Sequence, residues 1–325
     1  MTLALPLWFE VVSLVTLTLI LAADLLLVVV RPRVPTLRES SVWVAVYVGL
    51  ALLFAVTLLL VGGQETAGQF LAGWVTEYSL SVDNLFVFVI IIARFAVPAL
   101  LQQRVLLVGI LIALVFRGVF ILVGSALIES FSWIFYLFGA FLVYTAADQA
   151  FGLRPEGGGD NRLVAFLKRR LRVGDEYDGG RLRTTTAHGV TVFTPLVVVF
   201  ISIGSTDVLF ALDSIPAIFG ITQSPFIVFT ANLFALMGLR QLYFLLGGLL
   251  ERLEYLHYGI AFILAFIGVK LVLHALHVNE LPFINGGAPV EWAPEIGTGV
   301  SLVVIVGAIV VTVVVSLVTM RRSRS

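Results

Sequence analysis

Nine long apolar segments constrain this chain more than any other feature of its sequence. A bilayer core about 30 Å thick is crossed by roughly 20 apolar residues in a helix. Hydrophobic residues make up 60% of the chain and charged residues only 12%, against about 45–50% and about 25% in soluble domains. We therefore predict an all-α polytopic membrane protein with about nine transmembrane helices. The segments are 8–30, 42–61, 70–92, 104–128, 131–151, 191–219, 225–248, 257–277 and 298–320.

The basic residues of the loops predict the orientation of these helices. With nine spans, nearly all loop Lys and Arg residues fall on one side, and the opposite loops carry Glu65, Glu129, Glu280, Glu291 and Glu295. Under the positive-inside rule the N-terminus lies outside and the C-terminus in the cytoplasm. We expect a prokaryotic plasma membrane. The first apolar run has no basic residue before it, which favours a retained helix over a cleaved signal peptide.

The composition also excludes several classes of function. The formal net charge is zero, so the chain has no overall basic charge that would favour nucleic acid. It has no cysteine, which removes thiolate metal sites and cysteine nucleophiles. The sequence contains no phosphate loop, nucleotide fingerprint or nucleophile elbow, so we do not expect an enzyme. The histidines are expected at interfaces rather than in a zinc site: His188, His257, His274 and His277.

An acidic motif occurs twice in the apolar segments. The third span reads EYSLSVDNLFVF from Glu77, and the sixth reads DVLFALDSIPAI from Asp207. The spans that follow also resemble each other, 113–124 with 235–248 and, more loosely, 136–148 with 259–271. Spans 3–5 and 6–8 are therefore predicted to be two three-helix repeats of inverted topology, a design found in secondary transporters. The aligned pairs are Glu77 with Asp207, Asp83 with Asp213, and Asn84 with Ser214.

This repeat divides the chain into five parts. They are N-terminal helices at 1–69, the first repeat at 70–151, a basic and Gly-rich cytoplasmic loop at 152–190, the second repeat at 191–277, and an extracytoplasmic loop, last helix and basic tail at 278–325. The loop is expected to be a flexible linker. Its RLVAFLKRRLRV stretch could form a short basic helix on anionic lipid.

Carboxylates inside a membrane are expensive, at roughly 2.5–3.5 kcal/mol each on insertion scales. Two explanations of the repeated acids stay open. They form a site for a cation or a proton, or they are structural ion pairs with Arg117, Arg240 and Lys270. Because replacing a buried ion pair by apolar residues is often neutral or stabilising, the duplicated acids favour a site.

Helical geometry restricts how the acids could meet. At 100° per residue, Glu77, Ser81 and Asn84 share one face, and Asp83 lies about 120° away from Glu77. One straight helix therefore cannot aim both acids at one ion, whereas two crossing helices or a broken helix could. The sixth span offers breaks at 204–206 and at Pro216, and this proline would leave the carbonyl of Leu212 without its usual donor.

The oxygen-rich donor set predicts a hard divalent ion. Carboxylate, amide, hydroxyl and carbonyl oxygens suit Mn²⁺, Ca²⁺ or Mg²⁺, carried as substrate and not as a permanently bound cofactor. Asp24 is either a site member or a partner for a basic residue, and Lys270 could occupy the site when metal is absent. The predicted ligands are Glu77, Asp83, Asn84, Asp207, Asp213 and Ser214, with supporting roles for Asp24, Ser81, Thr206, Leu212, Arg117, Arg240, Lys270 and Asn232.

These motifs resemble the TerC family of membrane proteins over about residues 8–277. The resemblance is carried by EYSLSVDNLFVF, STDVLFALDSIPAIFGIT and ALMGLRQLYFLLGGLLERLEYLHYGIAFILAFIGVKL, with Asp24 late in the first span. It implies a place among exporters related to lysine exporters, built on inverted three-helix repeats, several of them linked to manganese efflux. One departure is the fifth span, YTAADQ, where a lysine is expected near Ala147 as Lys270 provides in the eighth.

The leading hypothesis is export of a divalent metal, with Mn²⁺ expected, by alternating access coupled to protons or to the membrane potential. A second hypothesis is an exporter of small organic cations or amino acids, in which Arg117 or Arg240 would bind a substrate carboxylate. A third is a membrane scaffold or insertion factor in tellurium or metal stress, with the 152–190 loop as its partner surface. The sequence does not define the oligomeric state.

Overall fold

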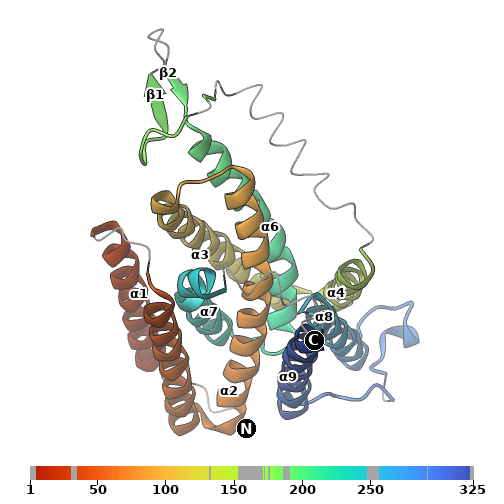
Figure 1. Ribbon diagram of the computed structural model, residues 1–325. Helices are drawn as coiled ribbons and strands as arrows, with labels where there is room; N and C mark the ends of the chain where they lie inside the picture. The colour runs from red at the N-terminus through yellow and green to blue at the C-terminus, as the bar shows by residue number, and fades with distance from the viewer. Residues whose placement is uncertain are drawn as a thin grey trace.

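The computed structural model describes residues 5–30, 35–131, 133–152, 171, 173–174, 176–185, 191–246, 256–290 and 292–322. These residues form a helical membrane protein with one small hairpin (Figure 1). The elements are α1 (Leu7–Val30), α2 (Leu37–Arg94), α3 (Ala99–Ser130), α4 (Ile134–Phe151), β1 (Arg183–Thr185), β2 (Thr191–Phe193), α6 (Pro195–Phe219), α7 (Pro225–Leu246), α8 (Leu256–His277), η2 (Asn285–Gly287) and α9 (Thr298–Arg322).

Helix α2 is a hairpin of two arms that turns at Gly63. Gly63 has φ 84° and ψ 177°, a conformation that is open to glycine almost alone. In a straight helix Phe54 and Phe70 would lie about 24 Å apart, yet their ring centroids are 5.0 Å apart. The first arm lies beside α1, and the second arm passes through the middle of the molecule (Figure 1). The two arms correspond to the predicted spans 42–61 and 70–92.

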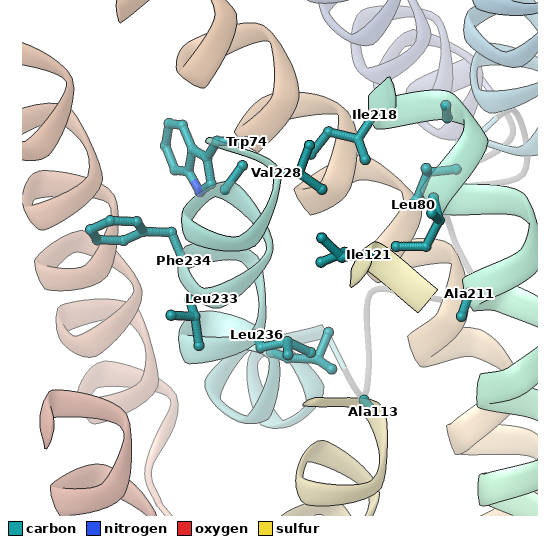
Figure 2. Close-up of a cluster of buried hydrophobic side chains, with 14 of the residues drawn as sticks. Trp74, Leu80, Ala113, Ile121, Ala211, Ile218, Val228, Leu233, Phe234 and Leu236 are labelled. Atoms are coloured by element: carbon teal, nitrogen blue, oxygen red, sulfur yellow. The ribbon is translucent and has the colours of Figure 1, made fainter. Parts of the chain in front are cut away.

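Helix α7 is the central element of the bundle. In the most apolar stretch of α7, 89% of the residues are buried, whereas in that of α9 only 17% are. Helix α7 is therefore surrounded by protein, and α9 exposes most of its apolar surface. Helices α2, α3 and α1 pack against α7. Figure 2 shows buried side chains of α2, α3, α6 and α7 in one hydrophobic cluster. The labelled core residues are Trp74, Leu80, Ala113, Ile121, Ala211, Ile218, Val228, Leu233, Phe234 and Leu236.

The number of membrane crossings is only partly established. Seven helices within the described residues are long and apolar enough to span a bilayer, with α2 counted once. The apolar stretch described for α6, Pro195–Val208, is shorter than a full span. Every predicted segment falls largely within a helix, but nine crossings and their inverted repeats stay predictions.

The helix packing pairs the two predicted repeats. The most extensive contacts join α2 with α7, α3 with α6, and α4 with α8. Suppose that each helix of the first predicted repeat swaps labels with its counterpart in the second: α2 with α6, α3 with α7 and α4 with α8. The α2–α7 pair then becomes the α3–α6 pair and the reverse, and the α4–α8 pair is unchanged. At the α4–α8 crossing a Cβ on Gly139 would lie 2.8 Å from the Gly268 carbonyl oxygen, and one on Gly268 would lie 2.9 Å from that of Gly139. This reciprocal contact aligns Gly139 with Gly268, a different register from the loose sequence match.

The 152–190 loop contains a short strand near its C-terminal end. This strand, β1, pairs antiparallel with β2, which follows the loop. The hydroxyl of Tyr177 donates to the backbone carbonyl of Phe95 at 2.7 Å, which ties the loop to the end of α2, and burial raises the pKa of Tyr177. The stretch expected to form a basic helix lies largely outside the described residues.

The α4–α8 crossing predicts the effect of a single methyl group. Gly139→Ala should lower the free energy of unfolding by about 1–3 kcal/mol, because the new Cβ meets backbone that cannot move aside easily. Thermal unfolding of the purified protein measures this effect. Gly307→Ala in α9, where a Cβ meets nothing within 4 Å, is the matched control and should leave stability nearly unchanged. Equal stability of the two variants would contradict this packing.

Candidate functional site: a buried cluster of carboxylates and one arginine

A buried ion pair joins α3 to the second arm of α2. The guanidinium of Arg117 contacts the carboxylate of Glu77 through Nη1 and Oε2, and the two side chains are 2% and 0% exposed. Asn232 of α7 donates to the same Oε2 at 3.3 Å. Arg117 therefore does not extend to the membrane surface, and Glu77 is held by donors from two other helices.

Several buried oxygens around this pair have no hydrogen-bond partner within the described residues. Asp207 of α6 is 3% exposed, and the charge of Arg117 acts on it. The hydroxyl of Ser214, also on α6, lies beside the Glu77 carboxylate without forming a well-aligned hydrogen bond. Four buried oxygens have no hydrogen-bond partner within the described part of the chain: Glu77 Oε1, Asp207 Oδ2, Ser81 Oγ and Ser214 Oγ. Buried acceptors of this kind are costly unless a donor or a cation completes them.

Asn84 completes the surroundings of Arg117. With its amide nitrogen directed to the Leu80 carbonyl at 3.0 Å, its oxygen accepts from Arg117 Nη2 at 3.3 Å. Arg117 Nε has no partner among the described residues. The arginine is thus held at its two terminal nitrogens only, by Glu77 on one and Asn84 on the other.

Helix α6 is continuous from Pro195 to Phe219, so the break that we expected at 204–206 is absent. The hydroxyl of Thr206 donates instead to the backbone carbonyl of Ser202, within the same helix, with 2.8 Å between the two oxygens. Pro216 lies inside α6 and offers no N–H to the Leu212 carbonyl. The carboxylates of Glu77 and Asp207 are brought together by two packed helices, α2 and α6, and not by a broken one.

Three predicted site residues cannot be placed at the level of side chains. Asp83 lies in α2, and Leu212 and Asp213 lie in α6, but their side chains are outside the described part of the structure. Their roles as ligands stay predictions. Among the described side chains, no group of three or more His, Cys, Asp and Glu residues forms a metal cluster.

Asp24 and Arg240 form a second ion pair away from this cluster. Arg240 Nη2 donates to Asp24 Oδ1 at 2.7 Å, between α7 and α1. Asp24 is therefore a partner for a basic residue, which was one of its two expected roles. The buried phenol of Tyr47, on the first arm of α2, interacts with the same carboxylate. Sequence reasoning missed Tyr47 because it lies outside the repeats.

Arg240 does not take the place of Arg117, although the two lie in blocks of similar sequence, 113–124 and 235–248. Arg240 points toward α1, where it pairs with Asp24. Arg117 is the one cationic side chain that the described residues place in the cluster.

Lys270 does not lie among the buried carboxylates, contrary to the role that we considered for it. Its Nζ donates to Ser301 Oγ at 3.0 Å, joining α8 to α9. It lines a cavity of about 1320 Å³ together with Glu10, Glu65, His274 and Glu295, at the end of the bundle where α1 begins. His274 and His277 lie in the last turn of α8 and His257 near its start, as expected for interfacial residues, whereas His188 is outside the described residues.

Sequence comparison assigns this fold and cluster to a class and then to a family. The class is that of polytopic helical membrane proteins with a charged cluster buried among the helices. The model of the integral membrane protein TerC family matches residues 62–324. The chain belongs to the TerC family, and the resemblance found in its motifs is confirmed.

Two relatives illustrate what is recorded for similar proteins. The chain is 49% identical to "Uncharacterized membrane protein Rv2723" of Mycobacterium tuberculosis, over 93% of this chain and 78% of the relative. It is 44% identical to "Putative membrane-bound redox modulator Alx" of Escherichia coli K12, over 80% of this chain and 84% of the relative. No solved structure matches the chain.

The central ion pair predicts strong coupling between Glu77 and Arg117. Glu77→Gln should lower the free energy of unfolding by about 3–5 kcal/mol, because it leaves a buried guanidinium without its counter-charge. Arg117→Gln should cost a similar amount, and the double variant should recover most of the loss. Thermal unfolding in metal-free buffer measures this cycle. Additive losses in the double variant would show that the two side chains do not interact.

Proposed function

We propose that this protein exports a divalent metal ion, with Mn²⁺ the expected substrate, by alternating access through a site between α2 and α6. The proposal includes nine membrane crossings, an external N-terminus and a cytoplasmic C-terminus. Transport is coupled to protons or to the membrane potential. The site combines Glu77 and Asp207 with Asn84 and Ser214, and it includes Asp83 and Asp213 from the same motifs.

The observation that carries the proposal is the pair of buried carboxylate oxygens, Glu77 Oε1 and Asp207 Oδ2, that have no hydrogen-bond partner among the described residues. The hydroxyls of Ser81 and Ser214 have none there either, and a hydroxyl can donate to a carboxylate or present its oxygen to a cation. Ionisable groups within membrane-spanning helices mark ion pathways more often than they serve stability. All-oxygen ligands suit hard cations such as Mn²⁺, Ca²⁺ and Mg²⁺.

The pairing of helices supports alternating access. The contacts α2–α7, α3–α6 and α4–α8 are preserved when each helix of the first repeat swaps labels with its counterpart in the second. Inverted repeats that pack in this way allow one repeat to rock against the other around a site at their interface. Glu77 and Asp207 occupy aligned positions on the first helix of each repeat, which is where such a site is expected.

Two other functions have less support from the contacts of the cluster. An amino-acid exporter would use Arg117 or Arg240 for the substrate carboxylate, but both guanidinium groups are engaged by protein carboxylates. One relative is named as a redox modulator. This chain has no cysteine, so a redox role through thiol–disulfide exchange is not open to it.

Transport assays on carboxylate variants test the proposal. Everted membrane vesicles containing the protein should accumulate Mn²⁺, and Asp207→Asn, Asp83→Asn and Asp213→Asn should each reduce the initial rate to that of vesicles without the protein. Removing one negative charge leaves a divalent ion with too little compensation in a membrane interior. Metal-loaded cells that express these variants should also lose protection.

The matched control is Glu176→Gln, which removes an exposed carboxylate from the cytoplasmic segment and should transport as the parent does. Excess lysine or arginine in the assay separates a metal substrate from an organic cation. Full Mn²⁺ transport by the aspartate variants would contradict the site, and inhibition of uptake by amino acids would favour the organic substrate.

A further inference from the structure

We infer that Arg117 is a built-in competitor of the transported ion, a tethered cation that holds Glu77 in the empty protein and must release it when metal binds. This inference rests on the proposed function and adds a positioning residue to it. Arg117 would set the affinity of the site and reset the carboxylate after the ion leaves. Lys270, which the sequence suggested for this role, contacts Ser301 on α9 instead.

Arg117 is held by few contacts within the described residues. Its Nη1 is engaged by Glu77 and its Nη2 by Asn84, while Nε has no partner there. Arg240 also leaves its Nε without a partner, but it pairs with Asp24 outside the cluster. Arg117 differs in that Asn232 also contacts the carboxylate it holds, and the charge of Arg117 acts on Asp207 as well. Retraction of the guanidinium would free Glu77 Oε2, and Asn232 could keep its own contact with that oxygen.

The cluster of Glu77 and Asp207 also explains why a competitor is needed. Two carboxylates without a cation would cost several kcal/mol in a membrane interior, and the empty carrier must still change conformation. Arg117 interacts with both carboxylates and reduces that cost.

The same reasoning predicts an asymmetric carrier. The arginine of the similar block in the second repeat, Arg240, is held by Asp24 of α1. Of the two carboxylates in the cluster, only Glu77 contacts a guanidinium within the described residues, and Asp207 keeps an oxygen that has no hydrogen-bond partner there. The first repeat thus contributes Glu77, a carboxylate in contact with an arginine. The second contributes Asp207, which has an oxygen without a hydrogen-bond partner among the described residues.

Binding of Mn²⁺ to the purified full-length protein tests the inference. The electron paramagnetic resonance signal of free Mn²⁺ gives the Kd for the parent, for Arg117→Gln and for Arg117→Lys. Arg117→Gln should bind Mn²⁺ about tenfold more tightly, because the ion no longer competes with the guanidinium for Glu77. The Kd of Arg117→Lys should lie between those of the parent and Arg117→Gln, because an ammonium cannot bridge Glu77 and Asn84 as the guanidinium does.

Transport by Arg117→Gln gives a second readout. The KM for Mn²⁺ and the kcat should both fall, because the ion leaves more slowly and the empty site loses its counter-ion. A residue with a merely structural role would raise KM. The amount of folded protein falls in either case, because the ion pair is lost, and is used to normalise kcat. If Arg117→Gln does not fold, the Kd of Arg117→Lys decides, with tighter binding than the parent expected and weaker binding overturning the inference.

The matched control is the double variant Asp24→Asn/Arg240→Gln, which removes a buried arginine–carboxylate pair outside the cluster and should keep the parental Kd. Folded Arg117→Gln with unchanged or weaker Mn²⁺ binding would overturn the inference and leave the proposed function intact. Absence of Mn²⁺ binding in the folded parent and in all variants would overturn the proposed function, and the inference with it.

Discussion

The ion pair between Glu77 and Arg117 is the interaction on which the interior of this protein depends. Both groups are enclosed by helices, and neither is tolerable there without the other. Because the pair links α2 to α3, and Asn232 links it to α7, three helices are fixed relative to one another. Asp207 and Ser214 on the neighbouring α6 add to a cluster in which one oxygen of each carboxylate has no hydrogen-bond partner among the described residues.

The surrounding fold supplies what such a cluster requires. Helix α7 is enclosed on nearly all sides and excludes lipid from the charged groups, whereas α1 and α9 carry exposed apolar residues. The turn at Gly63 lets one long helix provide both an outer arm and a central arm, and the central arm carries Glu77. A second ion pair, Asp24 with Arg240, joins α1 to α7 outside the repeats. Membership of the TerC family is consistent with this arrangement across residues 62–324.

Much of the fold follows from the sequence, because lipid imposes a simple rule on apolar helices. The predicted segments fall within helices, and the burial of Glu77, Asp207 and Ser214 follows from their place in apolar runs. The partners of the arginines did not follow as simply. Only packing reveals that Arg240 meets Asp24 and that Lys270 meets Ser301. The Gly-Ser-Thr stretch before Asp207 suggested a break, but the hydroxyls bond back to their own helix and α6 continues.

Anomalous diffraction at the manganese edge, from crystals soaked in Mn²⁺, tests the central claim most directly. A peak between α2 and α6, within bonding distance of Glu77 and Asp207 and with Arg117 withdrawn from Glu77, is the predicted result. The cavity lined by Glu65, Lys270 and Glu295 provides an internal comparison. A peak confined to that cavity would contradict the assignment of the site. An intact contact between Arg117 and Glu77 beside a bound ion would contradict the role of Arg117 as a competitor of the ion.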